Sequence, residues 1–246
     1  MKNSTIIHIP HASVEIPDRY RSTFVTPNLD RETAVMTDWF CDELFDCGRE
    51  RIVFPVSRLV CDVERFRDDA QEIMSRVGMG AVYERCSDGS PLRTVSEEQK
   101  RQILRSFYDA HHGKLTAAVR EKLRQYGRCI IIDAHSFYPL PLPHEPDQSG
   151  DRPDFCIGTS EYHTPPAVTE ALRTLLESRG YCVKIDSPFA GTIVPMEFYL
   201  RDRRVVSVMI EVNRSLYLSV PGVKNSAFSA VRDTLRDCVE YIEAAF

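Results

Sequence analysis

The sequence lacks the features that would place the protein in a membrane or on a nucleic acid. No apolar run reaches the roughly 18 to 20 residues that a helix needs to cross a bilayer. The first ten residues, MKNSTIIHIP, hold only a short apolar stretch that meets proline at once, unlike a signal peptide. Lys and Arg number 31 against 36 Asp and Glu, and the net charge of -5 provides no basic surface. We therefore expect a cytoplasmic protein with neither a membrane nor a nucleic-acid partner.

Motifs for thiol chemistry and for a nucleophilic hydroxyl are also missing. The eight cysteines form no CxxC pair, and several lie in apolar runs such as RLVCDV. This distribution indicates buried, reduced thiols and argues against a zinc site made of thiolates. The serine-hydrolase pattern GxSxG is absent and no cysteine stands beside a histidine, so neither nucleophile is expected.

The sequence does contain short apolar runs that alternate with longer amphipathic ones. We expect strands at 4–10, 51–57, 129–137, 154–159, 181–186 and 205–213. We expect helices at about 30–47, 96–126, 165–179 and 226–245. Several of the strand-like runs are apolar on both faces, which is typical of a sheet covered on both sides. The alternation predicts an α/β fold with a mixed, largely parallel sheet flanked by helices on both faces.

The chain is long enough for a substantial core. Its 246 residues are 43% hydrophobic, no linker divides them, and no internal repeat occurs, so we expect a single domain over residues 1–246. One long irregular stretch, the proline-rich PLPLPHEPDQSGDRPD at residues 139–154, directly follows a predicted strand. Loops of this length inside a compact domain are often binding loops or lids.

Polar residues follow several of the apolar runs. In an open α/β sheet, ligands bind just beyond the carboxyl ends of the strands, which is where these residues are expected. They are His11 after the first run, His135 in CIIIDAHSF, Arg65 after RLVCDV and Glu211 in VVSVMIEVN. Zinc prefers imidazole and carboxylate, and a catalytic zinc site uses three protein ligands with one open position. A further carboxylate can accept a proton, and an arginine can hold a substrate carboxylate. This inventory favours a mononuclear zinc hydrolase.

Each of these residues also has an ordinary interpretation. His11 by itself would be a loop residue with one hydrogen bond. Glu211 could form a buried ion pair with Arg214, because a carboxylate inside an apolar strand is costly unless it is paired or bound to a metal. The convergence of four strand ends favours the zinc site over these separate explanations.

Five segments then carry a resemblance to a known family. IPHASVEIP, TDWFCDELF, SRLVCDVERF, IIDAHSF and MIEVNRSLY resemble, in this order, the successive motifs of the N-formylglutamate amidohydrolase (deformylase) family. The resemblance runs from about residue 6 to residue 218. It implies a zinc-carboxypeptidase-like fold, similar also to aspartoacylase. It also implies zinc-dependent cleavage of N-formyl-L-glutamate to formate and L-glutamate, a step of histidine degradation.

The resemblance implies a site with one zinc ion per chain. It makes His11 and His135 zinc ligands and points to Asp38, in TDW, as the third. Glu15 is the alternative third ligand. Carboxypeptidase-like sites place a glutamate three residues after the histidine, but this chain has Val14 there and Glu15 one residue later.

The remaining roles also follow from the resemblance. Glu211 corresponds to the general base, and Arg65 to the residue that holds the carboxylate of a small-molecule substrate. Arg214, Ser136 and His112 are further candidates for substrate binding. For Arg214 the ion pair with Glu211 stays open as the alternative, and for His112 a place on a helix surface does.

The chain departs from the family pattern at Glu64, where it reads DVERF instead of the usual DLNR. A carboxylate beside Arg65 could weaken the binding of an anionic substrate, which leaves the acyl group and the amino acid open. Two other functions therefore stay under consideration: a zinc amidase or carboxypeptidase-like hydrolase acting on another N-acyl amino acid or small peptide, and a non-catalytic binding protein on the same scaffold. The sequence also leaves the oligomeric state open. Asp133 is expected to orient a ligand histidine through its second ring nitrogen.

Overall fold

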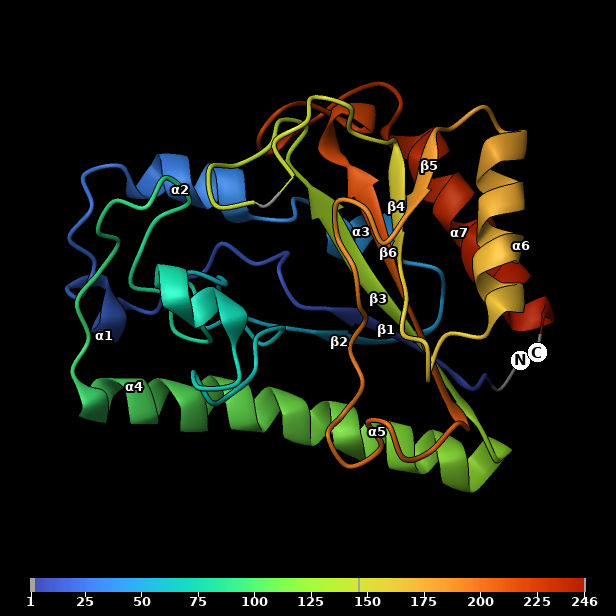
Figure 1. Ribbon diagram of the computed structural model, residues 1–246, viewed down its shortest axis with the longest axis horizontal. Helices are drawn as coiled ribbons and strands as arrows, with labels where there is room; N and C mark the ends of the chain where they lie inside the picture. Colours follow the sequence, from blue (N-terminus) through green and yellow to red (C-terminus); the bar gives the residue numbers. More distant parts are fainter. Residues whose placement is uncertain (1–2, 146, 246) are drawn as a thin grey trace.

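The computed structural model describes residues 3–145 and 147–245, which are organised around a six-stranded sheet (Figure 1). The strands are β1 (Thr5–Ile9), β2 (Glu50–Val53), β3 (Cys129–Phe137), β4 (Phe155–Gly158), β5 (Val183–Ile185) and β6 (Val205–Asn213). Their order is β2-β1-β3-β6-β4-β5, and neighbours are parallel except β4 and β6, which are antiparallel. The α/β fold with a mixed, largely parallel sheet is confirmed, as are the six strands expected from the sequence.

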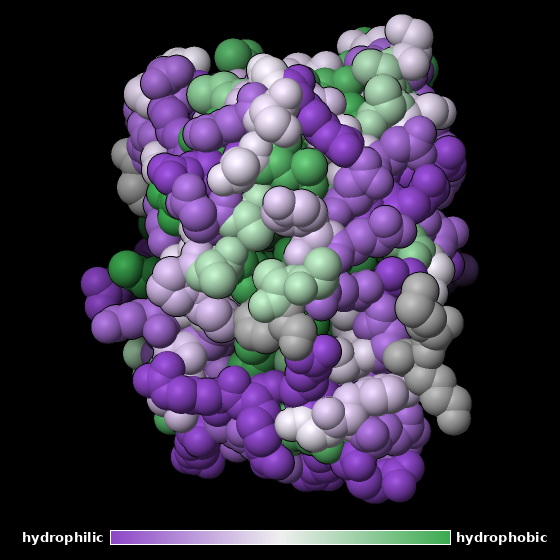
Figure 2. All heavy atoms as spheres, turned by 90° about the vertical axis from the view of Figure 1, so that its right-hand side faces the viewer, coloured by the Kyte–Doolittle hydropathy of each residue, from purple (hydrophilic) through white to green (hydrophobic). Residues whose placement is uncertain are grey.

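Helices cover both faces of this sheet. On one face lies a long helix made of α4 (Glu97–Ile103), a π-helical segment (Leu104–Asp109) and α5 (Ala110–Tyr126). On the other face lie α3 (Cys41–Leu44), α6 (Pro166–Ser178) and α7 (Phe228–Ala244). The outer side of α6 and α7 presents mostly hydrophilic residues, with apolar ones in small groups (Figure 2). Within the described residues, no helix has both the length and the apolar character needed to cross a membrane.

Shorter elements complete the chain. They are α1 (Asp18–Arg21), α2 (Leu29–Met36), two 3-10 turns (Ile73–Val77 and Arg214–Leu216) and a hairpin of β7 (Leu218–Val220) and β8 (Val223–Lys224). The long helix begins with a capping box, in which Ser96 and Gln99 each bond the other's backbone N–H through their side chains. It ends at Gly127, whose φ of 71° is the left-handed conformation that glycine adopts without strain.

The central strands β3 and β6 are buried along all nine of their residues. Because successive side chains of a strand point to opposite faces, each strand contributes to two separate cores. Ile132 and Val208 pack with residues of α6 and α7, whereas Ile131 and Val205 pack with residues of α5. Burial on both faces explains why these strands are nearly continuous runs of Val and Ile.

The helix expected at about 30–47 is broken in the structure. α2 ends at Met36, and Thr37 is extended, with a ψ of 134°. Phe40 has a φ of 60°, in the left-handed region, and α3 begins only after it. Asp38 lies in this break, where its backbone N–H donates to His11 O at 3.0 Å. The hydrophobic pattern did not reveal the break, because the chain bends toward a residue far away in the sequence.

The run RLVCDVERF was treated as the end of a strand, and this was wrong. Residues 57–66 form turns and irregular structure, and they belong to none of the strands of the sheet. Val60, Cys61 and Val63 are nevertheless buried, in a core shared with the first turns of the long helix. The run is apolar because this loop is packed into the interior, not because it pairs in a sheet. Arg93 supports it by donating to Val60 O at 2.6 Å.

Candidate active site

Alternation along the strands gathers polar residues on the sheet face that α5 covers. Asp133 and His135 point to the same face of β3 as Ile131, which packs on α5. His8 of β1 and Glu211 of β6 lie next to them in the adjacent strands. In the strand register, His8 is the partner of Asp133 and Glu211 is the partner of His135. Two histidines and two carboxylates therefore lie side by side near the carboxyl ends of three parallel strands.

His135 and two further buried side chains, His11 and Asp38, have the arrangement of a metal site. The ligand atoms offered by His11, Asp38 and His135 all lie within 4.8 Å of one another. Asp38 Oδ2 is 3.7 Å from His11 Nδ1 and 3.3 Å from His135 Nδ1. Tetrahedral zinc with bonds of about 2.0–2.1 Å needs ligand atoms about 3.3–3.4 Å apart. The three atoms fit such an ion with only small movements.

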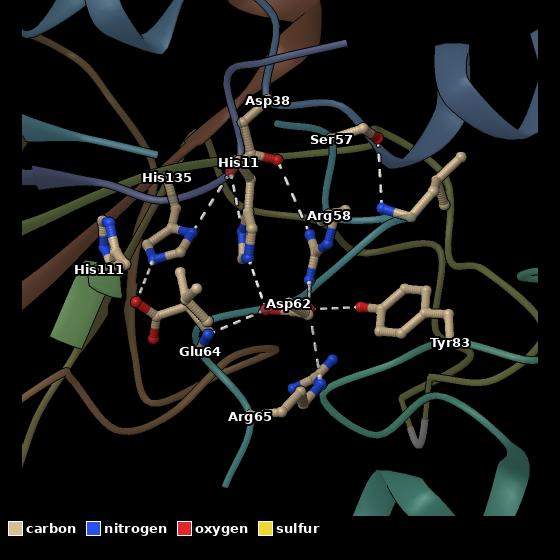
Figure 3. A network of polar contacts seen from close by, with 12 residues as sticks. His11, Asp38, Ser57, Arg58, Asp62, Glu64, Arg65, Tyr83, His111 and His135 are labelled. Atoms are coloured by element: carbon tan, nitrogen blue, oxygen red, sulfur yellow. Dashed lines mark hydrogen bonds and ion pairs between the residues drawn. The ribbon is translucent and has the colours of Figure 1, made fainter. Parts of the chain in front are cut away.

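The other ring nitrogen of each histidine is held by a carboxylate (Figure 3). His11 Nε2 donates to Asp62 Oδ1 at 2.8 Å, and His135 Nε2 donates to Asp133 Oδ1 at 3.1 Å. An ionised carboxylate can only accept, so each Nε2 carries a proton and each Nδ1 can offer its lone pair to a metal. His11 Nδ1 is buried and has no hydrogen-bond partner among the residues that the structure describes. A buried ring nitrogen with a lone pair and no hydrogen-bond partner is suited to bind a metal ion.

Asp38 is fixed by contacts from three directions. Besides its backbone bond to His11, its Oδ1 accepts from Arg214 Nη2 at 2.8 Å and its Oδ2 accepts from Ser136 N at 3.1 Å. Burial raises the pKa of Asp38, but His11, His135 and Arg214 outweigh this effect and hold the pKa well below its usual value. The residue is therefore an anionic carboxylate with one oxygen directed at the two histidines.

Glu15, the alternative third ligand, lies outside this group. Its side chain is exposed, and its backbone carbonyl accepts from Ser57 N. The chain between Pro10 and Ile16 runs toward the surface after β1, so it delivers His11 to the interior and Glu15 to solvent. Of the two carboxylates considered, only Asp38 stands beside both histidines.

Glu211 is a buried carboxylate with an unused oxygen. Its Oε2 has no hydrogen-bond partner, and the side chain lines the same cavity as His135 and Asp38. Burial raises the pKa of Glu211 to about 8, an effect that His135 and Arg214 oppose and the charge of Asp38 reinforces. A carboxyl group that binds a proton near neutral pH can both accept and return one.

A pair of arginines forms the adjoining wall of the cavity. Arg58 Nη2 donates to Asp62 Oδ2 at 2.8 Å, and Arg65 Nε lies 3.7 Å from the same oxygen. The hydroxyl of Tyr83 also donates to this carboxylate. Asp62 thus holds His11 on one oxygen and the two arginines on the other. The Arg65 side chain is 23% exposed, and its Nε has no hydrogen-bond partner, so this guanidinium has donors left for a ligand.

The other candidates for substrate binding are already engaged with the protein. Arg214 donates through Nε to Ser136 Oγ at 3.1 Å, through Nη2 to Ser136 O at 2.9 Å and to Asp38, and through Nη1 to Val35 O. Its ion-pair partner is thus Asp38 and not Glu211. His112 Nε2 donates to Val63 O at 2.8 Å, and the ring stacks on Tyr108. These contacts favour positioning roles over direct contact with a ligand.

These groups open into a cavity of about 690 Å³. His11, Asp38, His135 and Glu211 lie together in its lining, with Arg58 and Arg65 beside them. The proline-rich stretch 139–154 contributes Leu142, His144 and Glu145 to the lining, in agreement with a binding loop. The volume is ample for a small-molecule ligand.

Sequence reasoning noted Asp62 without giving it a role, and it missed Arg58, Tyr83 and the pair of His8 and His111. A signal for Asp62 was available, because it stands in SRLVCDVERF together with Arg65. Tyr83 comes 21 residues after Asp62 and is brought to it only by the folded loop. His8 stands inside the apolar run STIIHIP, where no pattern marked it as a site residue.

Replacing Asp62 with asparagine should weaken metal binding without removing a ligand. Asparagine keeps the shape but takes away the charge that fixes His11 Nε2, Arg58 and Tyr83. Loss of such an outer partner typically costs roughly 10- to 100-fold in metal affinity, and we expect this range for Asp62→Asn. Competition titration of zinc with a chromophoric chelator measures the change. An unaltered zinc affinity would contradict the role given to Asp62.

The comparison with protein families agrees with this geometry. A family model described as N-formylglutamate amidohydrolase matches residues 3–218. The chain belongs to the N-formylglutamate amidohydrolase family. The resemblance seen in the sequence motifs is thereby confirmed, and the family is one of amidohydrolases.

Individual relatives support the assignment. The N-formylglutamate deformylase of Pseudomonas putida is 26% identical over 223 residues, which cover 87% of this chain and 81% of that protein. The crystal structure of an N-formylglutamate amidohydrolase from Ralstonia eutropha JMP134 is similar in fold, with a TM-score of 0.78 and 19% identity over 98% of this chain and 92% of that one. A gene product of Agrobacterium tumefaciens has a TM-score of 0.73 and 16% identity over 99% of this chain and 92% of that one.

Proposed function

We propose that the protein hydrolyses the amide bond of N-formyl-L-glutamate in a zinc-dependent reaction that releases formate and L-glutamate. One observation carries the proposal: His11, Asp38 and His135 form a ligand group beside the unpaired carboxylate of Glu211, in a cavity whose wall holds Arg58 and Arg65. The family membership supports it, as does the similarity to the Pseudomonas N-formylglutamate deformylase.

Zinc is the proposed ion because of the donor set. Two imidazoles and one carboxylate suit Zn²⁺, and three protein ligands leave a position open for water or substrate. When bound, the ion lowers the pKa of water at that position and polarises the carbonyl of the amide. His11 and His135 would bind it through Nδ1, because their Nε2 atoms are held by Asp62 and Asp133.

Glu211 is the proposed general base. It accepts a proton from the attacking water, whose oxygen forms a bond to the formyl carbon. When the C–N bond breaks, Glu211 returns the proton to the departing amine, so that formate and the amino group of glutamate are released. Positioned acid–base groups of this kind contribute about 10²- to 10⁴-fold to a rate. The lack of a partner for Glu211 Oε2 supports this assignment, since a purely structural carboxylate would be bonded there.

The arginines supply the charge that an anionic substrate requires. Arg65, which has unused donors, is the proposed partner of a substrate carboxylate. Arg58 is anchored to Asp62 and lies 4.0 Å from Asp38, closer to the ligand group. It is the proposed donor to the oxygen that becomes negative when water adds to the amide carbonyl.

The Arg65→Gln variant should bind the substrate poorly while keeping the chemical step. Removing a hydrogen-bonded charge costs about 1.5–3 kcal/mol, which corresponds to a KM raised roughly 10- to 100-fold with a much smaller change in kcat. Arg65→Lys is the matched comparison, and it should recover only part of the loss because it cannot form two parallel bonds. Steady-state kinetics on N-formylglutamate measures both. An unchanged KM would remove Arg65 from the binding site.

The direct test is a hydrolysis assay on zinc-loaded protein. N-formyl-L-glutamate is offered beside N-formyl-L-glutamine, N-formyl-L-leucine and N-acetyl-L-glutamate, and free amine is measured. We expect N-formyl-L-glutamate to give the highest kcat/KM. A better rate with another N-acyl amino acid would replace the substrate but keep the reaction, and no turnover with any amide would leave a binding protein on the same scaffold.

A further inference from the structure

The carboxylate of Glu64 lies in the outer part of the site but does not pair with the arginines. Its Oε1 is 3.1 Å from His8 Nδ1 and 3.9 Å from His135 Nε2. Figure 3 shows the carboxylate pointing toward His135 and away from the Arg65 guanidinium, although Glu64 and Arg65 are adjacent in the sequence. Its backbone N–H donates to Asp62 Oδ1 at 3.0 Å, which holds the backbone of Glu64 beside the ligand group.

The side chain in contact with this carboxylate is His8. Its Nδ1 donates to Asp133 Oδ1 at 2.9 Å and so carries a proton, and Glu64 Oε1 lies 3.1 Å from the same nitrogen, at ion-pair distance and with no hydrogen-bond partner among the described residues. Its Nε2 lies 2.8 Å from Nε2 of His111, at the start of α5. Burial lowers the pKa of His8, but Asp133 and Glu64 raise it to about 9, whereas burial and the charge of His8 lower the pKa of His111 to about 2. The two carboxylates at ion-pair distance from Nδ1 favour His8 as the cation, with His111 as the acceptor of its Nε2–H.

We propose that His8 is a positioning residue that binds and neutralises Glu64, so that the wall of Arg58 and Arg65 keeps its positive charge for a dicarboxylate ligand. The inference rests on the proposed function and deepens it, because it explains how the site can accept an acidic substrate despite the Glu64 side chain. Without His8, the unpaired charge of Glu64 would act on the arginines that line the same cavity. The carboxylate would then compete with the substrate for them.

The strand register makes the pairing of His8 with Glu64 possible. His8 is the register partner of Asp133 in the adjacent strand, on the face that α5 covers, and it is only 1% exposed. Glu64 reaches the same point from the loop at residues 57–66. Two acidic residues and one histidine with this spacing could also hold a cation. The contact between His8 and His111 and the two carboxylates near His8 Nδ1 favour a proton there instead.

A double-mutant cycle tests the proposal. Glutarate, a dicarboxylate that cannot be hydrolysed, is titrated into zinc-loaded protein by calorimetry. The variants are His8→Asn, Glu64→Gln and the two combined, with Glu98→Gln as the control, since Glu98 is an exposed carboxylate paired with Arg101 on α4. We expect His8→Asn to weaken binding by roughly tenfold or more, Glu64→Gln to change it by less than about threefold, and the combined variant to regain nearly the wild-type affinity.

Two further measurements keep the result interpretable. Zinc content is determined for each variant, and the ring ¹⁵N signals of His8 are recorded in the wild type. We expect one zinc per chain throughout and both nitrogens of His8 protonated. If His8→Asn alone does not fold, the combined variant is compared with Glu64→Gln, and the two should bind glutarate equally within about threefold.

Several results would overturn the proposal. They are absence of rescue in the combined variant, loss of zinc in His8→Asn, a second zinc per chain that depends on His8, a neutral His8 ring, or no binding of glutarate to the wild type. The proposed function fails separately. Protein that binds glutarate with the expected rescue, but does not hydrolyse N-formyl-L-glutamate, would refute the reaction and leave the His8–Glu64 pair intact.

Discussion

The His135→Ala variant should lose both its zinc and its activity, which is the largest effect expected of any single change in this protein. In the proposed metal site, His135 offers Nδ1 to the ion and bonds Asp133 through Nε2, so alanine would remove a ligand and leave Asp133 with one partner fewer. Wild-type protein should contain about one zinc per chain, and the variant close to none. The loss of activity should exceed the roughly 10- to 100-fold caused by removing an outer partner.

Metal analysis of both proteins, purified in parallel, makes this measurement. His163→Ala is a matched control, because His163 is also a buried histidine, but its ring bonds Val205 O and Leu200 N, away from the ligand group. It should retain zinc. If well-folded wild-type protein takes up no zinc even when the metal is supplied, or if His135→Ala retains it fully, the metal site is refuted and a binding function becomes the better explanation.

The second large effect is expected for Glu211→Gln, which should keep the zinc but lose the chemistry. Glutamine has the shape of glutamate but cannot accept a proton, so kcat should fall by about 10²- to 10⁴-fold. Because the binding wall is untouched, KM should change little. The variant should also melt no lower than the wild type, since it replaces a buried carboxylate whose Oε2 has no hydrogen-bond partner.

Kinetics, zinc content and thermal unfolding together separate this outcome from a structural one. Glu243→Gln is the control for neutralising a carboxylate: Glu243 pairs with Arg49 far from the cavity, so kcat should be unchanged even if stability falls. A Glu211→Gln variant that retains most of the wild-type kcat would exclude Glu211 as the base. A variant that loses its zinc would make Glu211 part of the metal site instead.

The sequence by itself determined the framework and the central residues of the site. The six apolar runs became the six strands of the sheet, and the central ones, β3 and β6, are apolar on both faces because helices cover both. Alternation along β3 and β6 then places His135 and Glu211 on one face, and this regularity needs no knowledge of distant contacts. The family was also readable from the sequence, since its motifs follow one another in order.

Only the tertiary structure decided the residues that come from irregular segments. The periodic pattern continued through Asp38 as if it were helical, and Glu15 stayed the alternative third ligand until the fold left it in solvent. Asp38 stands beside His11 because the helix breaks and the backbone bonds across to the end of β1. Asp62, Arg58 and His8 acquire their roles through partners far away in the chain or on another element. Local patterns record how a segment is buried, whereas these roles depend on which segments meet, and that is fixed only when the chain packs.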